Sequence, residues 1–269
     1  SRIYLGSNLV EMGTLRITFL GTGTSQGVPL IGCHCEVCSS TDNKDKRLRT
    51  SCLIESEQGT VLTIDAGPDF RQQMLTNNVD RLDAILVTHS HRDHISGLDD
   101  VRSYNYLQSE AMPIFSNKIA LKEIKRAFSY AFSDTKYPGL PTFNLVNIEK
   151  KNKFNIKELE IIPIEVMHFK LPIMAYRINN FAYITDGKTI TEQEKEKLKG
   201  VEYLVLNALR KEEHFSHFTL DEALALINEI KPKQAYLTHI SHNLGLTKDL
   251  EKELPSNVSL AYDGLTIKV

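Results

Sequence analysis

One short segment, Thr88-His-Ser-His-Arg-Asp-His94, carries the densest group of side chains that could do chemistry. Within six residues it places His89, His91, Asp93 and His94. Unpaired polar groups are costly to bury, at roughly 2–7 kcal/mol each. Imidazole and carboxylate groups are ordinary ligands of divalent metal ions, which remove that cost. The segment therefore predicts a metal site.

The elements around this segment indicate where the site lies. Leu82–Val87 is an apolar run typical of a buried strand, and Ile95–Asp100 is typical of a loop that enters a helix. Open α/β sheets place their chemistry at the carboxyl ends of strands. Three further residues each follow an expected strand in the same way: His168, Asp186 and His239. Because they share this position, we expect them in the same site.

Composition and charge are those of an ordinary globular protein. The 269 residues are 41% hydrophobic and 25% charged, with a formal net charge of −2. This charge argues against a protein that wraps nucleic acid by bulk electrostatics. No stretch approaches the ~20 apolar residues of a membrane span, and residues 1–13 lack the pattern of a secretion signal. We expect a cytoplasmic protein with no membrane association, in which Cys52 is a buried thiol.

The expected elements form two β-rich halves. In the first half we expect strands at 15–20, 52–55, 61–64 and 84–87, with helices at 70–76 and 119–131. In the second we expect strands at 159–166, 174–178, 182–184, 203–206, 235–237, 259–261 and 266–268, with helices at 220–230 and 248–254. This order predicts an α/β fold with two sheets face to face and helices outside. Residues 1–13 are expected to be an N-terminal extension and 14–269 one domain. Segment 136–142 is expected to be a surface loop, or a lid over substrate.

The complete set of residues resembles the metallo-β-lactamase superfamily, whose signature is H-x-H-x-D-H followed by a distant His, Asp and His. The resemblance covers the chain from about Leu15 onward and implies a four-layer αββα sandwich with two metal ions in a cleft. It implies that one ion takes His89, His91 and His168. It implies that the other takes Asp93, His94 and His239, with Asp186 bridging. The family's early aspartate corresponds to Asp65, which would orient ligands.

The implied two-metal centre suggests a reaction. Two cations roughly 3.5–4 Å apart can generate a bridging hydroxide and stabilise both oxygens of an in-line displacement. Asp93 and Asp186 are the charged ligands, so two divalent ions leave the site positive by about two charges, which favours a small anionic substrate. The β-lactamases proper carry Cys where Asp186 stands, and diiron flavoprotein oxidases carry Glu at the place of His91. Neither group fits.

A second metal site is indicated by a C-x-C-x-x-C motif in a loop rich in turn residues, made by Cys33, Cys35 and Cys38. Three thiolates are one short of the tetrahedral set of a structural zinc, and His242 could supply the fourth ligand. In extended backbone, residues three apart point to opposite faces, so His239 would face the active site and His242 the thiolates. The alternative is a reduced loop without metal.

These features narrow the resemblance to the family of phosphonate-pathway phosphodiesterases that open phosphoribosyl 1,2-cyclic phosphate. The match rests on Gly21–Pro29, the cysteine motif and the Thr-His-Ile-Ser-His sequence at 238–242. We interpret the glycines of Gly21–Pro29 as a tight turn, because no Lys-Ser/Thr phosphate-loop partner follows. In that family three cysteines and a histidine hold a structural zinc, and the catalytic metals are manganese or zinc.

The family's general acid corresponds to His217, which precedes an expected helix. Histidine has the right pKa range to hold and release a proton at neutral pH. The alternatives are that His217 is incidental to helix capping, or that His214 has this role. We therefore expect a metal-dependent phosphodiesterase with His217 and Asp93 as catalytic residues, acting on a small cyclic or nucleotide-like phosphodiester.

Two other functions stay open within the same superfamily. A tRNA 3′-processing endonuclease would carry a basic, Gly-rich arm, which this sequence lacks, so a nucleic-acid partner is not expected. An iron-dependent oxidoreductase would resemble the pyrroloquinoline quinone biosynthesis protein, which also has a cysteine loop of this kind. The sequence allows a homodimer with either reaction.

Overall fold

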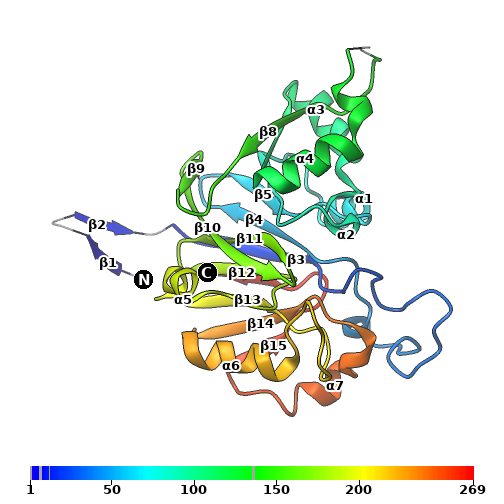
Figure 1. Ribbon diagram of the computed structural model, residues 1–269, viewed down its shortest axis with the longest axis vertical. Coiled ribbons are helices and arrows are strands. Elements are labelled where there is room, and N and C mark those ends of the chain that lie inside the picture. Colours follow the sequence, from blue (N-terminus) through cyan, green and yellow to red (C-terminus); the bar gives the residue numbers. More distant parts are fainter. Residues whose placement is uncertain (1, 6–7, 12, 135–136) are drawn as a thin grey trace.

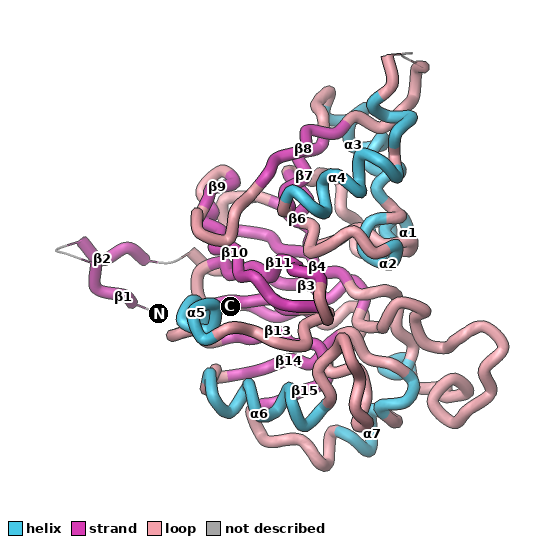
Figure 2. Tube along the Cα trace, viewed as in Figure 1, coloured by secondary structure: helices cyan, strands magenta, loops and turns pink. Residues whose placement is uncertain are grey.

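The computed structural model describes residues 2–5, 8–11, 13–134 and 137–269. Two seven-stranded sheets lie face to face, with helices on their outer sides (Figures 1 and 2). The four-layer αββα sandwich implied by the sequence is confirmed.

The first sheet comes mainly from the N-terminal half and has the order β16-β3-β4-β5-β6-β7-β8. Its strands are β3 (Leu15–Gly21), β4 (Ser51–Ser56), β5 (Val61–Ile64), β6 (Ala84–Leu86), β7 (Met112–Ser116), β8 (Phe143–Asn147) and β16 (Thr266–Lys268). Strands β5 to β8 are parallel. Its helices are α1 (Phe70–Thr76), α2 (Arg92–Ile95), α3 (Arg102–Gln108) and α4 (Lys118–Ala127).

The second sheet has the order β15-β14-β13-β12-β11-β10-β9. Its strands are β9 (Phe154–Ile156), β10 (Leu159–His168), β11 (Leu171–Ile178), β12 (Phe181–Ile184), β13 (Tyr203–Asn207), β14 (Gln234–Thr238) and β15 (Val258–Leu260). Strands β12 to β15 are parallel. Its helices are α5 (Glu192–Lys195), α6 (Leu220–Ile230) and α7 (Thr247–Leu250).

The core between the two sheets joins the two halves of the chain. Ile17 and Ile64 of the first sheet pack in one buried cluster with Tyr176 and Tyr183 of the second. The last strand, β16, crosses back and pairs antiparallel with β3. Separate clusters lie under α6 and under α1 and α4 on the outer faces. The two halves therefore share their apolar core.

The sequence at the start of helix α6 determines where the helix begins, and the loop before it carries a candidate site residue. Thr219 caps its N-terminus by accepting from the backbone N–H of Glu222, whose side chain accepts from the Thr219 N–H in return. This capping box satisfies two N–H groups that the first helical turn leaves free. The helix begins at Leu220 as predicted, and its start fixes the loop that carries His217.

Several expectations about the elements need correction. The predicted helix at 119–131 ends at Ala127 and continues as a 3-10 turn, Ser129–Phe132. Strands β7, β8 and β9 were not predicted. The interpretation of segment 136–142 as a lid loses support, because Phe143, which directly follows the segment, packs on Phe128 and Phe132. The ring centroids are 5.9 and 5.8 Å away. Residues 135–136 lie outside the described residues.

The expected N-terminal extension contains β1 (Arg2–Leu5) and β2 (Asn8–Glu11), which pair antiparallel with each other (Figure 1). Residues 1, 6–7 and 12 of that extension lie outside the described residues. Across the part of the chain that the structure describes, no helix has both the length and the apolar character that crossing a bilayer requires.

Candidate metal centre

The ends of five strands converge on one site. The histidine segment follows β6, Asp65 follows β5, His168 ends β10, and Asp186 and His239 follow β12 and β14. Asp65, Asp186 and His239 have φ values of 64°, 56° and 54°. A non-glycine residue in this left-handed region is uncommon and costs of order 1–3 kcal/mol, and such residues gather at functional sites. The strained turns aim these side chains into the site.

The predicted ligands fall into two groups. The first is His89, His91 and His168, and the second is Asp93, His94, Asp186 and His239; within each group the ligand atoms lie within 4.8 Å of one another. Asp186 approaches both groups. Its Oδ2 lies 3.8 Å from His89 Nε2, and its Oδ1 lies 3.2 Å from the Nε2 atoms of His94 and His239. The structure therefore brings all seven residues together.

The donor atoms fit metal ions. The Nε2 atoms of His89, His94 and His239 are buried and face the carboxylates of Asp93 and Asp186 without an aligned hydrogen bond. A buried polar atom without a hydrogen bond costs about 1–3 kcal/mol, a cost that a metal ion at this point would remove. Burial, with neighbouring imidazoles, lowers the pKa of His89 and of His91, which leaves neutral rings with free lone pairs. Five imidazoles and two carboxylates suit zinc, manganese or iron.

The charges in the second group favour cation binding. Burial opposes the charged form of Asp186, but His239 and His94 outweigh it and hold the pKa of Asp186 well below its usual range. Burial likewise opposes ionisation of Asp93, and His94 reverses the balance and lowers its pKa. Both carboxylates are therefore negative at neutral pH.

Hydrogen bonds on the far side of the rings set which nitrogen faces the centre. His94 Nδ1 donates to Asp65 Oδ2 at 2.6 Å. Thr88 Oγ1 donates to the same carboxylate at 2.8 Å and lies 3.0 Å from His89 Nδ1. His168 Nδ1 donates to the Asp186 carbonyl oxygen at 2.8 Å. These contacts leave the three Nε2 atoms for metal, as expected of residues that orient ligands.

Two supporting residues were missed from the sequence. Thr88 precedes the histidine segment and links Asp65 to His89, as described above. Asn207 ends β13 and holds the turn after Asp186: it accepts from Gly187 N at 2.8 Å and donates to Gly187 O at 2.9 Å. A buried amide at the end of the apolar run Tyr203–Leu206 was the available signal, and it shares the strand-end position that identified His168 and His239.

His217 lies at the edge of the centre. Its ring centroid is 4.8 Å from that of His168 and 4.9 Å from that of His239, and its Nδ1 is 4.0 Å from Asp186 Oδ2. Burial, and then His239, lower the pKa of His217 to about 3. These surroundings favour the neutral ring, and the role of His217 as general acid stays a prediction. His214 is half-buried beside it, with ring centroids 5.0 Å apart.

The second predicted metal site is also assembled. His242 Nδ1 lies 3.5, 3.3 and 3.5 Å from the Sγ atoms of Cys33, Cys35 and Cys38. The backbone N–H of Cys38 is the largest influence that lowers the pKa of Cys35 to about 6, whereas burial raises the pKa of Cys38 to about 11. Of these two thiols, Cys35 is therefore the one held as the thiolate that zinc binds. Cys52 lies elsewhere and is fully buried, and burial raises the pKa of its thiol.

The reason given for the orientation of His242 was wrong. The chain is not extended between His239 and His242: His239 has a φ of 54°, and a 3-10 turn, His242–Leu244, begins at His242. The turn separates the two rings.

The glycine-containing segment Gly21–Pro29 packs beside this turn, because Gly23 forms β-bridges with both Arg49 and Ile240. A Cβ at Gly21 would lie 1.9 Å from the Arg49 carbonyl oxygen. This close backbone approach explains the glycines structurally.

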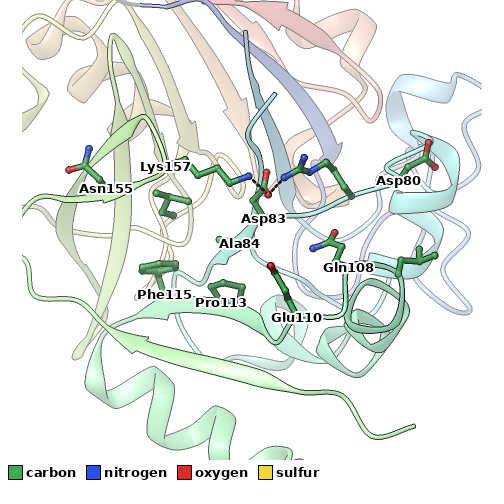
Figure 3. Close-up of a pocket in the computed structure, with 12 residues that line it drawn as sticks. Asp80, Asp83, Ala84, Gln108, Glu110, Pro113, Phe115, Asn155 and Lys157 are labelled. Atoms are coloured by element: carbon green, nitrogen blue, oxygen red, sulfur yellow. Dashed lines mark hydrogen bonds and ion pairs between the residues drawn. The ribbon is translucent and has the colours of Figure 1, made fainter. Parts of the chain in front are cut away.

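A separate groove of about 760 Å³ lies near Asp83 and Ala84, at the start of β6, whereas the ligands follow the end of that strand (Figure 3). Asp83 there contacts both Arg81 and Lys157. The charge of Asp83 is thus already compensated. The acidic residues of the groove do not form a ligand group among the described residues. The predicted metal ligands lie at the opposite end of the strand.

Known proteins are similar to this chain in sequence and fold. A crystal structure described as a new diphosphatase from the PhnP family is 36% identical, covers 95% of this chain and 97% of its own, and has a TM-score of 0.89. An octanoyltransferase of Porphyromonas gingivalis is 40% identical over 93% of this chain. This chain spans about half of that relative's length, at 51%.

A coenzyme PQQ synthesis protein B of Methylobacterium radiotolerans matches over a shorter stretch. It is 29% identical over 101 residues, which are 33% of this chain and 34% of the relative. Residues 60–240, which include the active-site ligands, match the model of the Beta-lactamase superfamily domain. The chain therefore belongs to the metallo-β-lactamase superfamily.

Proposed function

We propose that this chain is a metal-dependent phosphodiesterase that hydrolyses a small cyclic or nucleotide-like phosphodiester. The observation that carries the proposal is the position of Asp186. Its two oxygens approach the first ligand group through His89 and the second through His94 and His239. One carboxylate between two groups of imidazoles suits a pair of ions, and such pairs serve in-line displacement at phosphorus.

In this proposal His89, His91 and His168 hold one ion, and Asp93, His94 and His239 hold the other, with Asp186 between them. Zinc or manganese ions would supply Lewis-acid activation of water and of the phosphoryl oxygens. Two divalent ions carry four positive charges, and the carboxylates of Asp93, Asp186 and Asp65 carry three negative ones. The net charge of the centre is therefore about +1, which attracts an anionic substrate. Asp93 is assigned a catalytic role because its carboxylate lies between His94 and His239, at 3.0 and 3.6 Å.

His217 is proposed as the proton donor to the leaving oxygen. The position of the ring beside His168 and His239 supports this role. In the free chain the ring is neutral, so the role depends on the negative charge of bound substrate, which favours a protonated imidazole.

A structural zinc is proposed at Cys33, Cys35, Cys38 and His242. All four cysteines of the chain are free thiols, which supports a reducing compartment such as the cytoplasm. The zinc would tie the cysteine loop to the turn after His239. It thereby supports the position of an active-site ligand.

The diphosphatase name of the PhnP-family structure makes a phosphoanhydride the second candidate substrate. Cleavage of a P–O–P linkage makes the same demands on the two ions as cleavage of a phosphodiester, but its phosphate leaving group needs no proton from His217. The octanoyltransferase name gives weaker guidance, because this chain spans only half of that relative. Cys52, the thiol outside the cluster, is fully buried and so is unsuited to carry an acyl group.

The test is reconstitution. Protein stripped with a chelator and reloaded with zinc or manganese is offered a 2′,3′-cyclic nucleotide, phosphoribosyl 1,2-cyclic phosphate and a dinucleoside diphosphate. We expect phosphodiester turnover that disappears in Asp186→Asn, which keeps its circular dichroism and binds fewer ions. Turnover of the diphosphate alone supports the second candidate. Iron in protein purified without added metal, with activity only under oxygen, would support the oxidoreductase alternative.

A further inference from the structure

Two solvent-exposed phenylalanine rings contact each other beside the candidate metal centre. Phe169 is 54% exposed and Phe215 is 68% exposed, yet their centroids are 5.5 Å apart in a T-shaped pair. Phe169 directly follows His168, and Phe215 lies two residues before His217. The pair therefore joins two segments that each carry a histidine of the candidate site.

The hairpin turn accounts for the backbone at Phe169, but not for the bulky side chain at that position. His168 pairs with Leu171, so Phe169 and Lys170 form the two-residue turn between β10 and β11. Phe169 has a φ of 54°, in the left-handed region that glycine adopts without strain and that hairpin turns favour. A bulky side chain at such a position costs free energy, and here its ring is not buried in the core. A binding role would explain both observations.

A series of ring contacts connects this pair with the centre. His214 stacks on Phe215, with centroids 4.7 Å apart and an angle of 22° between the planes. The His214 ring is in turn 5.0 Å from that of His217. Lys170 Nζ lies 5.3 Å from the centroid of Phe169 and places a positive charge at the outer edge. A ligand with its phosphate at the metals could thus extend along aromatic faces.

We propose that Phe169 and Phe215 form a stacking site for the nucleobase of the substrate, which makes the substrate a nucleoside phosphodiester and not a sugar phosphate alone. This inference rests on the proposed function of the same centre. Each base has a flat π-face that stacks on aromatic side chains without sequence preference. A sugar phosphate without a base has no flat π-face to stack on the two rings.

The experiment compares a matched pair of substrates that differ only in the base: adenosine 2′,3′-cyclic phosphate and 1-O-methylribose 2,3-cyclic phosphate. In Phe215→Ala we expect kcat/KM for the nucleotide to fall about 5- to 150-fold, mainly through KM, because base stacking contributes on this scale. The base-free substrate should change less than about twofold. Phe215→Tyr should restore the discrimination, since it keeps the ring.

Phe169→Gly removes the other ring while keeping the turn conformation, and should have the same selective effect. Tyr106→Ala on α3 is the control, because Tyr106 is an aromatic residue that is 86% exposed and belongs to the opposite half of the fold. Binding is measured separately by the fluorescence anisotropy of 1,N6-ethenoadenosine monophosphate. We expect weaker binding in both phenylalanine variants and an unchanged value in Tyr106→Ala.

The outcomes separate this inference from the proposed function. If wild-type protein hydrolyses neither these two cyclic phosphates nor phosphoribosyl 1,2-cyclic phosphate, the proposed function fails, and the anisotropy measurement alone decides on the stacking site. If the protein hydrolyses both substrates and the variants lose both equally, the rings support the fold and the inference is overturned. A change from dimer to monomer in Phe215→Ala, with unchanged nucleotide binding, would also overturn it.

Discussion

Asp65 Oδ2 accepts a 2.6 Å hydrogen bond from Nδ1 of His94, and both side chains are completely buried. Burial alone would lower the pKa of His94, but the carboxylates of Asp93, Asp186 and Asp65 raise it well above its usual value. The Asp65 contact also fixes the ring so that Nε2 faces Asp93 at 3.0 Å. A cation in the second ligand group would take over the position that a proton holds on Nε2.

The Asp65 contact predicts the effect of Asp65→Asn. The amide keeps the size of the side chain but removes the charge that holds His94, so we expect metal affinity to fall about 10- to 100-fold. Titration against a competing chelator measures this change. Asp80→Asn, at an exposed position, is the matched control. Equal affinity in wild type and Asp65→Asn would show that Asp65 does not orient the ligand.

Gly67 predicts a second, purely steric effect on the metal site. A Cβ at Gly67 would lie 2.0 Å from the carbonyl oxygen of Asp93, so Gly67→Ala must displace the backbone that carries a ligand. We expect the free energy of unfolding to fall by about 1–3 kcal/mol, together with weaker metal binding.

Gly13→Ala is the control for this effect, because its new Cβ would meet only Glu57 Oε2, at 3.9 Å. Urea unfolding and metal titration of the two variants give the comparison. The steric argument fails if Gly67→Ala binds metal as tightly as Gly13→Ala does.

The cysteine site predicts a change in metal content. His242→Ala removes the ligand that lies within 3.5 Å of all three thiols. We expect one zinc fewer per chain by elemental analysis and a lower melting temperature, because a structural zinc contributes directly to folding. His34→Ala, in the same exposed loop, should leave both values unchanged. An unchanged zinc count in His242→Ala would exclude His242 as a ligand.

The strand-end rule explains why the candidate site could be assembled from sequence. His168, Asp186 and His239 each follow an apolar run, and strands that run in the same direction bring such ends to one edge of a sheet. Strand β7 was not predicted from the sequence, because a proline such as Pro113 argues against an inner strand. The first register pair of β6 with β7 is Ile85 with Ile114, so Pro113 lies before the shared ladder and its missing N–H is tolerated.

Other features could not be predicted because they depend on contacts between distant residues. Phe169 and Phe215 are 46 positions apart, and neither lies in a pattern that indicates an exposed ring pair. The pKa of His217 depends on burial and on His239, which the sequence does not place beside it. Residue types and spacing thus predicted the candidate ligands, whereas their electrostatic surroundings required the fold.

Asp263 predicts a pH dependence of stability away from the metal centre. Its carboxylate accepts from Leu48 N at 2.6 Å and from Thr22 Oγ1 at 2.8 Å, and burial raises its pKa to about 6. In the unfolded chain an aspartate titrates near pH ~3.9. Between about pH 4 and pH 6 the folded state therefore keeps a proton that the unfolded state has released. The contribution of Asp263 to the free energy of unfolding falls as pH rises through this window and then levels off.

Asp263→Asn isolates this contribution. A raised pKa of this size corresponds to at most about 3 kcal/mol, and partial exposure of the residue reduces the expected loss to about 1–2 kcal/mol. The variant loses an acceptor at every pH but has no carboxylate to titrate. Urea unfolding in chelator between pH 4 and pH 7 should therefore show the wild-type advantage shrinking as pH rises. Parallel curves for the two proteins would mean that Asp263 already ionises at its ordinary pKa in the folded chain.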